Sequence, residues 1–215
     1  MKKKLHQYEG MCIVLLFVLF SIIAWRVHVG GVTMMDTYVR GLVKGLQTES
    51  SLTFFSYFTK MGSEIGIITT LVISLLIFWK KRYYAAMIVY PMAILMTHLV
   101  NKGIKEIVKR DRPSLNEALD ALGYSFPSGH AMLSIVTFGF LAYIIAANLK
   151  SIAGKCGITI LMGILIVWIG LSRVILNVHY PTDILAGYCA GGILLIIAIY
   201  CHRLLTERLG LNNER

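Results

Sequence analysis

The segment from Ser172 to Asp183 places an arginine, a histidine and an aspartate between two long apolar runs. His179 and Asp183 are four residues apart, one helical turn, so the carboxylate can hold a ring nitrogen of the histidine if a helix begins here. Arg173 adds a planar cation that suits a phosphate. Charges beside membrane-length apolar segments are costly unless they face water, a ligand or a partner. The segment therefore predicts a nucleophilic or general-base histidine, an orienting aspartate and an anion clamp.

A second polar cluster, Phe126-Pro127-Ser128-Gly129-His130, leads directly into an apolar run. Proline, serine and glycine before a helix leave backbone N–H groups free at the positive end of the helix dipole, which favours an anion. His130 adds a group that can transfer a proton. The alternative is a plain helix N-cap, in which Ser128 caps the helix and His130 is incidental.

A third cluster runs from Lys105 to Pro113. We expect the preceding span to continue as a helix to Arg110. Lys105, Lys109 and Arg112 stand at positions i, i+4 and i+7, the spacing of one helical face. The alternative is a basic patch that faces solvent or lipid headgroups. Together the three clusters bring two histidines, at least three cations and a helix N-terminus to one side of the protein. This combination indicates an anionic substrate and proton transfer.

The composition indicates the scaffold that must position these residues. The chain has 215 residues, of which 57% are hydrophobic and 15% charged, with a mean hydropathy of +0.71. These values indicate an integral membrane protein with a single domain, residues 1–215. The net charge of +10 would suggest nucleic acid as a partner of a soluble protein. Here the basic residues lie in short loops between apolar runs, so topology signals and anionic headgroups explain them and no nucleic-acid partner is expected.

Six apolar segments are long enough to cross a bilayer, which predicts an all-α fold, a six-helix transmembrane bundle. They are Met11–Val29, Ile65–Trp79, Tyr83–Leu99, Ala131–Leu149, Ile158–Leu171 and Ile184–Tyr200. Between the first two spans, apolar residues recur at helical spacing from Met34 to Leu46, with charges between them. This pattern predicts a short interfacial helix, either lying in the membrane surface or capping the bundle as a soluble helix.

Six spans put both termini on one side of the membrane. Basic residues are almost equally frequent on the two sides, so the positive-inside rule decides only if six cations on the side of the three clusters are set aside, because several of them are expected to bind the anion. The cations set aside are Lys102, Lys105, Lys109, Arg110, Arg112 and Arg173. The termini are then cytoplasmic and the site faces outward from a multi-pass protein of the plasma membrane. This expectation depends on the functional argument.

In three segments the sequence resembles the signature of the type 2 phosphatidic acid phosphatase (PAP2) superfamily. The segments are Lys105-x6-Arg112-Pro113, Pro127-Ser128-Gly129-His130 and Ser172-Arg173-x5-His179-x3-Asp183. The resemblance covers residues 105–183 directly, and the six-span pattern extends it over most of the chain. The family contains membrane lipid phosphatases, glucose-6-phosphatase and soluble vanadium haloperoxidases. The apolar spans argue against the haloperoxidase branch.

The resemblance implies a role for each signature residue. His179 attacks phosphorus to form a phosphohistidine, and Asp183 orients it. His130 protonates the leaving oxygen and then activates water. The phosphoryl oxygens are held by Lys105, Arg112, Ser128, the Gly129 N–H and Arg173. Fixed cations neutralise the phosphate, so neither a metal nor another cofactor is expected.

The implied substrate is a membrane lipid that carries a phosphate or diphosphate, such as phosphatidylglycerophosphate, phosphatidic acid or undecaprenyl diphosphate. One alternative is a phosphotransferase that passes the phosphate to an acceptor other than water. Another is a lipid-phosphate binding or transport protein, in which His179 could be lost without cost. The sequence carries no signal of the oligomeric state.

Overall fold

The computed structural model describes residues 2–114 and 122–211, and within these ranges every regular element is a helix. The predicted all-α fold is therefore confirmed. The elements are α1 (Lys2–Gly30), α2 (Met34–Lys44), α3 (Glu49–Phe58), the 3-10 helix η1 (Thr59–Gly62), α4 (Glu64–Lys81), α5 (Tyr84–Val108), α6 (Gly129–Asn148), α7 (Ile152–Ile175) and α8 (Pro181–Arg208).

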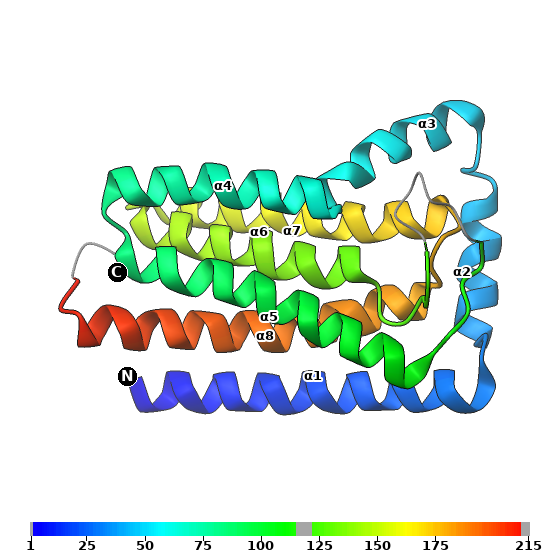
Figure 1. Ribbon diagram of the computed structural model, residues 1–215, viewed down its shortest axis with the longest axis horizontal. Helices are drawn as coiled ribbons and strands as arrows, with labels where there is room; N and C mark the ends of the chain where they lie inside the picture. The colour runs from blue at the N-terminus through cyan, green and yellow to red at the C-terminus, as the bar shows by residue number, and fades with distance from the viewer. Residues whose placement is uncertain (1, 115–121, 212–215) are drawn as a thin grey trace.

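The long helices run side by side, and the short α2 crosses one end of the bundle (Figure 1). The first turn of α1 and the last turn of α8 lie at the opposite end. Helix α6 packs against α5, α7 and α8 and is the most buried of the spans. The Tyr90 and Phe140 rings stack in this interface, with centroids 5.2 Å apart and an interplanar angle of 11°. Such pairs add about 0.5–1.5 kcal/mol beyond the area that they bury.

Five helices of the described chain, α1 and α5 to α8, are long and apolar enough to cross a membrane. The sixth predicted span lies in α4, which meets the α3–η1 segment at an angle of 48° and counts as a crossing when the bent pair is taken as one span. Helix α4 begins where the Ser63 side chain accepts a hydrogen bond from the Gly66 N–H at 3.2 Å. The six-span prediction thus holds with one broken span.

The segment between the first two spans contains more helix than predicted. Where one interfacial helix was expected, α2 is followed by α3 and η1, because Gly45 ends α2 and the Thr48 side chain caps a new helix at the Ser51 N–H. Helix α2 exposes an apolar face, on which Met34 is 92% exposed, and buries Asp36 completely. An exposed apolar face beside a bundle of spans favours the membrane-surface alternative.

The predicted helical face of Lys105, Lys109 and Arg112 is not formed. Helix α5 ends at Val108, and Lys109 takes the left-handed conformation with φ of 51°. The chain then turns, so that Lys109 is exposed, Arg110 is buried and Arg112 stands in a loop. The partners of Arg110 explain the turn. Its side chain reaches two buried carboxylates, and a helix that continued past Val108 would carry Arg110 away from them.

Candidate active site

The three clusters of the sequence meet at the end of the bundle that α2 crosses. They come from the last turns of α5 and the loop after it, the first turn of α6, and the α7–α8 connection. A cavity of about 460 Å³ opens between them. Its walls are formed by Gly62, Glu64, His98, Asn101, Lys102, Lys105, Arg112, Leu122, Gly129, His130, Leu133 and His179. Five of the eight predicted site residues thus line one cavity.

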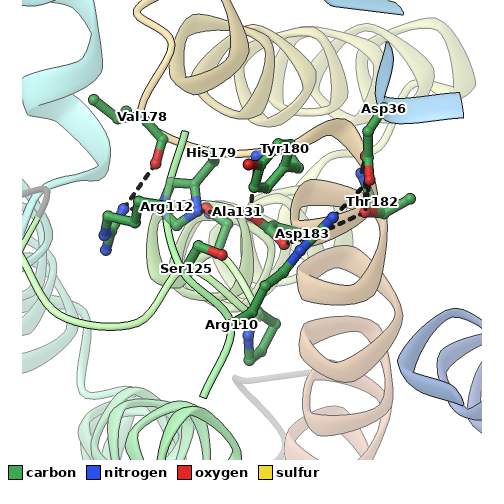
Figure 2. Close-up of polar contacts among 12 residues, drawn as sticks. Asp36, Arg110, Arg112, Ser125, Ala131, Val178, His179, Tyr180, Thr182 and Asp183 are labelled. Atoms are coloured by element: carbon green, nitrogen blue, oxygen red, sulfur yellow. Dashed lines mark hydrogen bonds and ion pairs between the residues drawn. The ribbon is translucent and has the colours of Figure 1, made fainter. Parts of the chain in front are cut away.

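His179 and Asp183 are in contact, with Nδ1 of the imidazole 3.3 Å from Oδ2 of the carboxylate (Figure 2). The pair does not lie within one helix. Helix α8 begins at Pro181, so His179 precedes it and Asp183 stands in its first turn. The same Oδ2 accepts the backbone N–H of Tyr180 at 2.9 Å, which fixes the carboxylate at the helix start.

The other ring nitrogen of His179 faces a cation. Nη1 of Arg112 lies 2.9 Å from Nε2 and also donates to the Val178 carbonyl at 3.0 Å. Because a guanidinium can only donate, Nε2 presents its lone pair and the ring proton sits on Nδ1, facing Asp183. Burial lowers the pKa of His179 well below 6.5, and the positive charges of Arg112, Arg173 and Lys105 lower it further. The imidazole is therefore neutral at neutral pH, as a nucleophile must be.

His130 is the second residue of α6 and is buried in the cavity wall. Its Nε2 has no hydrogen-bond partner within residues 2–114 and 122–211. Gly62 of η1 packs directly against this ring, since a Cβ there would lie 3.2 Å from Cδ2 of His130 and 2.5 Å from Cγ2 of Ile169. Only glycine fits between them. The second histidine thus lines the cavity from a tightly packed position, with a buried ring nitrogen that has no partner among the described residues.

The Ser128 side chain caps the N-terminus of α6. Its Oγ accepts the Ala131 N–H at 3.4 Å, and its own N–H donates to the Asp183 carbonyl at 3.0 Å. This is the capping role that the sequence left open as an alternative, and it ties the start of α6 to the start of α8. Gly129 lines the cavity, and a side chain there would lie 3.2 Å from Oδ1 of Asn101.

The two remaining predicted cations differ in placement. Lys105, near the end of α5, lines the cavity. Arg173 is completely buried near the end of α7, where its Nη1 donates to Oγ1 of Thr59 at 3.0 Å. Its backbone carbonyl accepts the N–H groups of Val178 and His179, so Arg173 also shapes the loop that carries the histidine.

Two residues to which the family resemblance assigns no role complete the site. Arg110 donates to Oδ1 of Asp183 at 2.5 Å and to Oδ2 of Asp36 at 2.6 Å (Figure 2). Arg110 stood in the basic cluster of the sequence, but nothing there separated it from Lys109. Asp36 follows Thr33 with capping-box spacing, which marks the start of α2 and carries no sign of a distant partner.

Within the described ranges, no group of three His, Cys, Asp or Glu side chains is placed to hold a metal ion. The expectation of metal-independent chemistry stays a prediction.

The family model described as "PAP2 superfamily" matches residues 85–207. Phosphatidylglycerophosphatase B of Bacillus subtilis (strain 168) is 27% identical over 185 residues, which cover 85% of this chain and 90% of that protein. A PA-phosphatase related-family protein of Dictyostelium discoideum is 37% identical over 105 residues, which cover 46% of this chain and 29% of that protein.

Solved structures agree with these matches. The crystal structure of a transmembrane PAP2 type phosphatidylglycerolphosphate phosphatase from Bacillus subtilis superimposes with a TM-score of 0.80 at 25% identity, covering 92% of this chain and 96% of that one. That of Aquifex aeolicus LpxE superimposes with a TM-score of 0.60 at 20% identity, covering 79% and 99%, and shares the fold. The prediction of a membrane enzyme that hydrolyses lipid phosphates is confirmed at the level of the family. The chain belongs to the PAP2 superfamily.

Proposed function

We propose that the protein removes a terminal phosphate from a membrane lipid through a phosphohistidine intermediate on His179. The observation that carries this proposal is the state of the His179 ring. Its Nδ1 lies against the Asp183 carboxylate, and its Nε2 lone pair lies at a cavity wall, 2.9 Å from the Arg112 guanidinium. A nucleophile oriented by an acid and placed beside an oxyanion clamp fits phosphoryl transfer.

In the first half-reaction, the phosphate of the substrate takes over the guanidinium of Arg112, which frees Nε2 of His179. Nε2 attacks phosphorus and the bond from phosphorus to the leaving oxygen breaks. His130, which takes up a proton when the phosphate dianion binds among the surrounding cations, gives that proton to the leaving oxygen. The Asp183 carboxylate stabilises the positive charge that develops on the phosphorylated ring. Arg112, Lys105 and the Gly129 N–H bind the equatorial oxygens, while buried Arg173 adds its charge.

In the second half-reaction, His130 accepts a proton from water, and the resulting hydroxide attacks phosphorus. The bond between phosphorus and Nε2 of His179 breaks, which releases inorganic phosphate and restores the neutral imidazole. The proton that His130 gave to the lipid product is thereby replaced. Each turnover consumes one water and yields one dephosphorylated lipid and one phosphate.

An apolar cavity of about 270 Å³ supports a lipid substrate. It lies between α4 and α5, and shares Glu64, His98 and Leu133 with the catalytic cavity. Its other walls are Ile67, Ile68, Leu71, Pro91, Ile94 and Leu95. A lipid whose phosphate occupies the polar cavity therefore has an apolar path for its tails into the bilayer.

Phosphatidylglycerophosphate is the headgroup that we place first. The support is the Bacillus subtilis relative named for this activity, which matches 85% of the chain. Phosphatidic acid and undecaprenyl diphosphate follow, because they present the same terminal phosphate on an apolar anchor.

We infer further that the site faces outward, with the termini in the cytoplasm. The basic Lys80-Lys81-Arg82 turn between α4 and α5 lies at the end of the bundle opposite α2, where α1 begins and α8 ends (Figure 1). Basic turns favour the cytoplasmic side. A membrane-impermeant thiol reagent tests this orientation on single cysteines introduced at Lys81 and at Lys44 of a variant whose four native cysteines are replaced by serine.

The function is tested by phosphate release from the purified protein in detergent with EDTA, across the three lipids, with His179→Ala in parallel. We expect release from at least one lipid and its loss in the variant. Transfer of phosphate to an added alcohol at the expense of free phosphate would indicate a phosphotransferase. Full activity of His179→Ala, or binding of the lipids without release, would overturn the proposal.

A further inference from the structure

One guanidinium joins two buried carboxylates behind the catalytic histidine. Asp36 and Asp183 are both 0% exposed and Arg110 is 7% exposed. Nη1 of Arg110 donates to Oδ1 of Asp183 at 2.5 Å and to Oγ1 of Thr182 at 2.8 Å. Nη2 donates to Oδ2 of Asp36 at 2.6 Å and to the Gly31 carbonyl at 2.7 Å. The guanidinium carbon also lies 4.1 Å from the centre of the Tyr180 ring.

The two oxygens of Asp183 have separate tasks. Oδ1 accepts from Arg110, while Oδ2 faces Nδ1 of His179 and accepts the Tyr180 N–H. A carboxylate held at both oxygens cannot rotate about its terminal bond without losing one set of partners. The orientation of the His179 ring therefore depends on the contact of Arg110 with the other side of Asp183.

Asp36 in turn holds Arg110 and the residue next to Asp183. Its Oδ1 accepts the backbone N–H and the hydroxyl of Thr182, at 3.0 and 2.8 Å. Its Oδ2 accepts Nη2 of Arg110 and the Thr33 N–H. Within the described residues, every contact of this carboxylate comes from a donor, so the amide of an asparagine must turn its NH₂ group toward at least one of them and lose that bond.

The charges of the group act on the reaction. Two carboxylates and one guanidinium leave one net negative charge on the Nδ1 side of His179. The cations Lys105 and Arg112 line the cavity where the phosphate binds, and buried Arg173 adds its charge. A negative charge at Nδ1 stabilises the imidazolium that forms when Nε2 carries the phosphoryl group. Without Arg110, two buried carboxylates repel each other and one of them takes up a proton.

We propose that Asp36 and Arg110 are positioning residues of the phosphoryl-transfer reaction, which hold the Asp183 carboxylate ionised and aimed at Nδ1 of His179. This inference rests on the proposed function. It makes the interfacial helix α2 part of the catalytic apparatus, since α2 supplies Asp36. The alternative is a purely structural role, in which the same contacts only hold α2 against α8. The two roles predict different kinetics for the variants below.

The test compares Asp36→Asn, Arg110→Lys, Arg110→Gln and the double variant Asp36→Asn/Arg110→Gln. The matched control is Glu9→Gln, which removes an ion pair with Arg203 between α1 and α8 at the far end of the bundle. Each protein is measured in detergent for its melting midpoint, for kcat and KM separately, and for the pH profile of kcat/KM.

We expect Asp36→Asn and Arg110→Lys to lower kcat by about 10- to 100-fold, with KM within about twofold, because positioning errors act on the transition state. Arg110→Lys keeps the charge but loses the fork that bridges the two carboxylates. Glu9→Gln keeps the wild-type kcat, even if its melting midpoint falls as far.

The pH profile of kcat/KM separates the effect of the Arg110 charge on the two carboxylates from the effect of its packing. The groups that face His179 are Asp183 at Nδ1 and the cations Arg112, Lys105 and Arg173, with His130 across the cavity. In Arg110→Gln the acid limb of kcat/KM moves to higher pH, because the two carboxylates then share a proton. The double variant has one carboxylate fewer, so its acid limb moves part of the way back to the wild-type position. In Asp36→Asn and Arg110→Lys it stays in place.

Two results overturn the inference. One is a wild-type kcat in both folded conservative variants, Asp36→Asn and Arg110→Lys. The other is an unchanged acid limb in a folded Arg110→Gln protein. If Arg110→Gln does not fold, the two conservative variants decide. His179→Ala in the same series distinguishes failure of the proposed function from failure of this inference. Full activity of His179→Ala would refute the proposed function. If His179→Ala is inactive while Asp36→Asn and Arg110→Lys both keep the kcat of the wild type, only this inference is refuted.

Discussion

The guanidinium of Arg112 lies 2.9 Å from Nε2 of His179, so in the substrate-free protein a cation covers the lone pair of the proposed nucleophile. The contact also lowers the pKa of the imidazole, after the larger effect of its burial. A phosphate that enters the cavity offers the guanidinium a charged acceptor in place of a neutral nitrogen. Arg112 thereby couples substrate binding to exposure of the nucleophile.

Replacing Arg112 with lysine should lower kcat/KM by about 100-fold, because a point charge cannot hold two phosphoryl oxygens and the loop carbonyls together. The guanidinium currently bonds to the carbonyls of Leu122, Gly123 and Val178. Lys109→Asn is the matched control, since Lys109 is an exposed cation three residues away in a conformation that asparagine tolerates. Steady-state kinetics with one lipid decides, and equal losses in the two variants would remove Arg112 from the phosphate site.

The lowered pKa of His179 predicts the pH dependence. Below pH 6.5 an unfolded chain binds a proton on this histidine, whereas the folded protein does not until lower pH. The contribution of the buried neutral ring to stability is therefore present above pH 6.5 and is lost as the pH falls. For catalysis, the nucleophile stays neutral and the acid limb of kcat/KM lies below 6.5.

Profiles for a phosphate monoester and a diphosphate lipid separate this limb from ionisation of the substrate. A limb that arises from the protein lies at the same pH with both lipids, whereas a limb that arises from the substrate differs between them. An acid limb above pH 6.5 that both lipids share would contradict a neutral His179 with a lowered pKa.

A methyl group added at Gly62 should disable His130. It would lie 2.5 Å from Cγ2 of Ile169, which must shift, and 3.2 Å from Cδ2 of His130, so the ring must give by a few tenths of an ångström. We expect Gly62→Ala to lose about 1–3 kcal/mol of stability and at least roughly tenfold in kcat. Gly103→Ala, where a Cβ meets nothing within 4 Å, is the control and should behave as wild type. An active, stable Gly62→Ala protein would show that His130 needs no fixed position.

Filling the cavity between α4 and α5 should discriminate against long lipids. Leu95→Trp places a large ring in this apolar cavity, whereas Ile160→Trp adds the same ring to the exposed face of α7. The first variant should raise KM for a lipid with long acyl chains by about tenfold and leave a short-chain analogue unaffected, because only long tails reach the cavity. If both variants change KM equally, the tails take another path.

The sequence alone predicted the spans and the signature residues, because the length of an apolar run and the spacing of charged residues are local properties. It failed where contacts with distant segments determine the placement of a residue. Arg110 and Lys109 are adjacent and both basic, yet one is buried between two carboxylates and the other is exposed. The difference comes from Asp36, which α2 carries across the end of the bundle to meet the start of α8.

The same long-range contacts explain the end of α5. The sequence pattern favours a helix up to Arg110, but ending the helix at Val108 lets Arg110 satisfy two buried charges. The bend between the α3–η1 segment and α4 follows Gly62, which packs against His130 and Ile169, another contact between segments far apart in the sequence.

The most direct test is to trap the phosphoryl group. The wild-type protein and the His130→Asn and His179→Ala variants are mixed with a radiolabelled aryl phosphate, whose leaving group needs no proton, quenched in base and mapped by peptide. We predict a base-stable, acid-labile label on the peptide that contains His179, accumulating in His130→Asn because hydrolysis of the intermediate is slowed, and absent from His179→Ala. Phosphate release by the wild type with no label on His179 in either the wild type or His130→Asn would contradict the phosphohistidine mechanism.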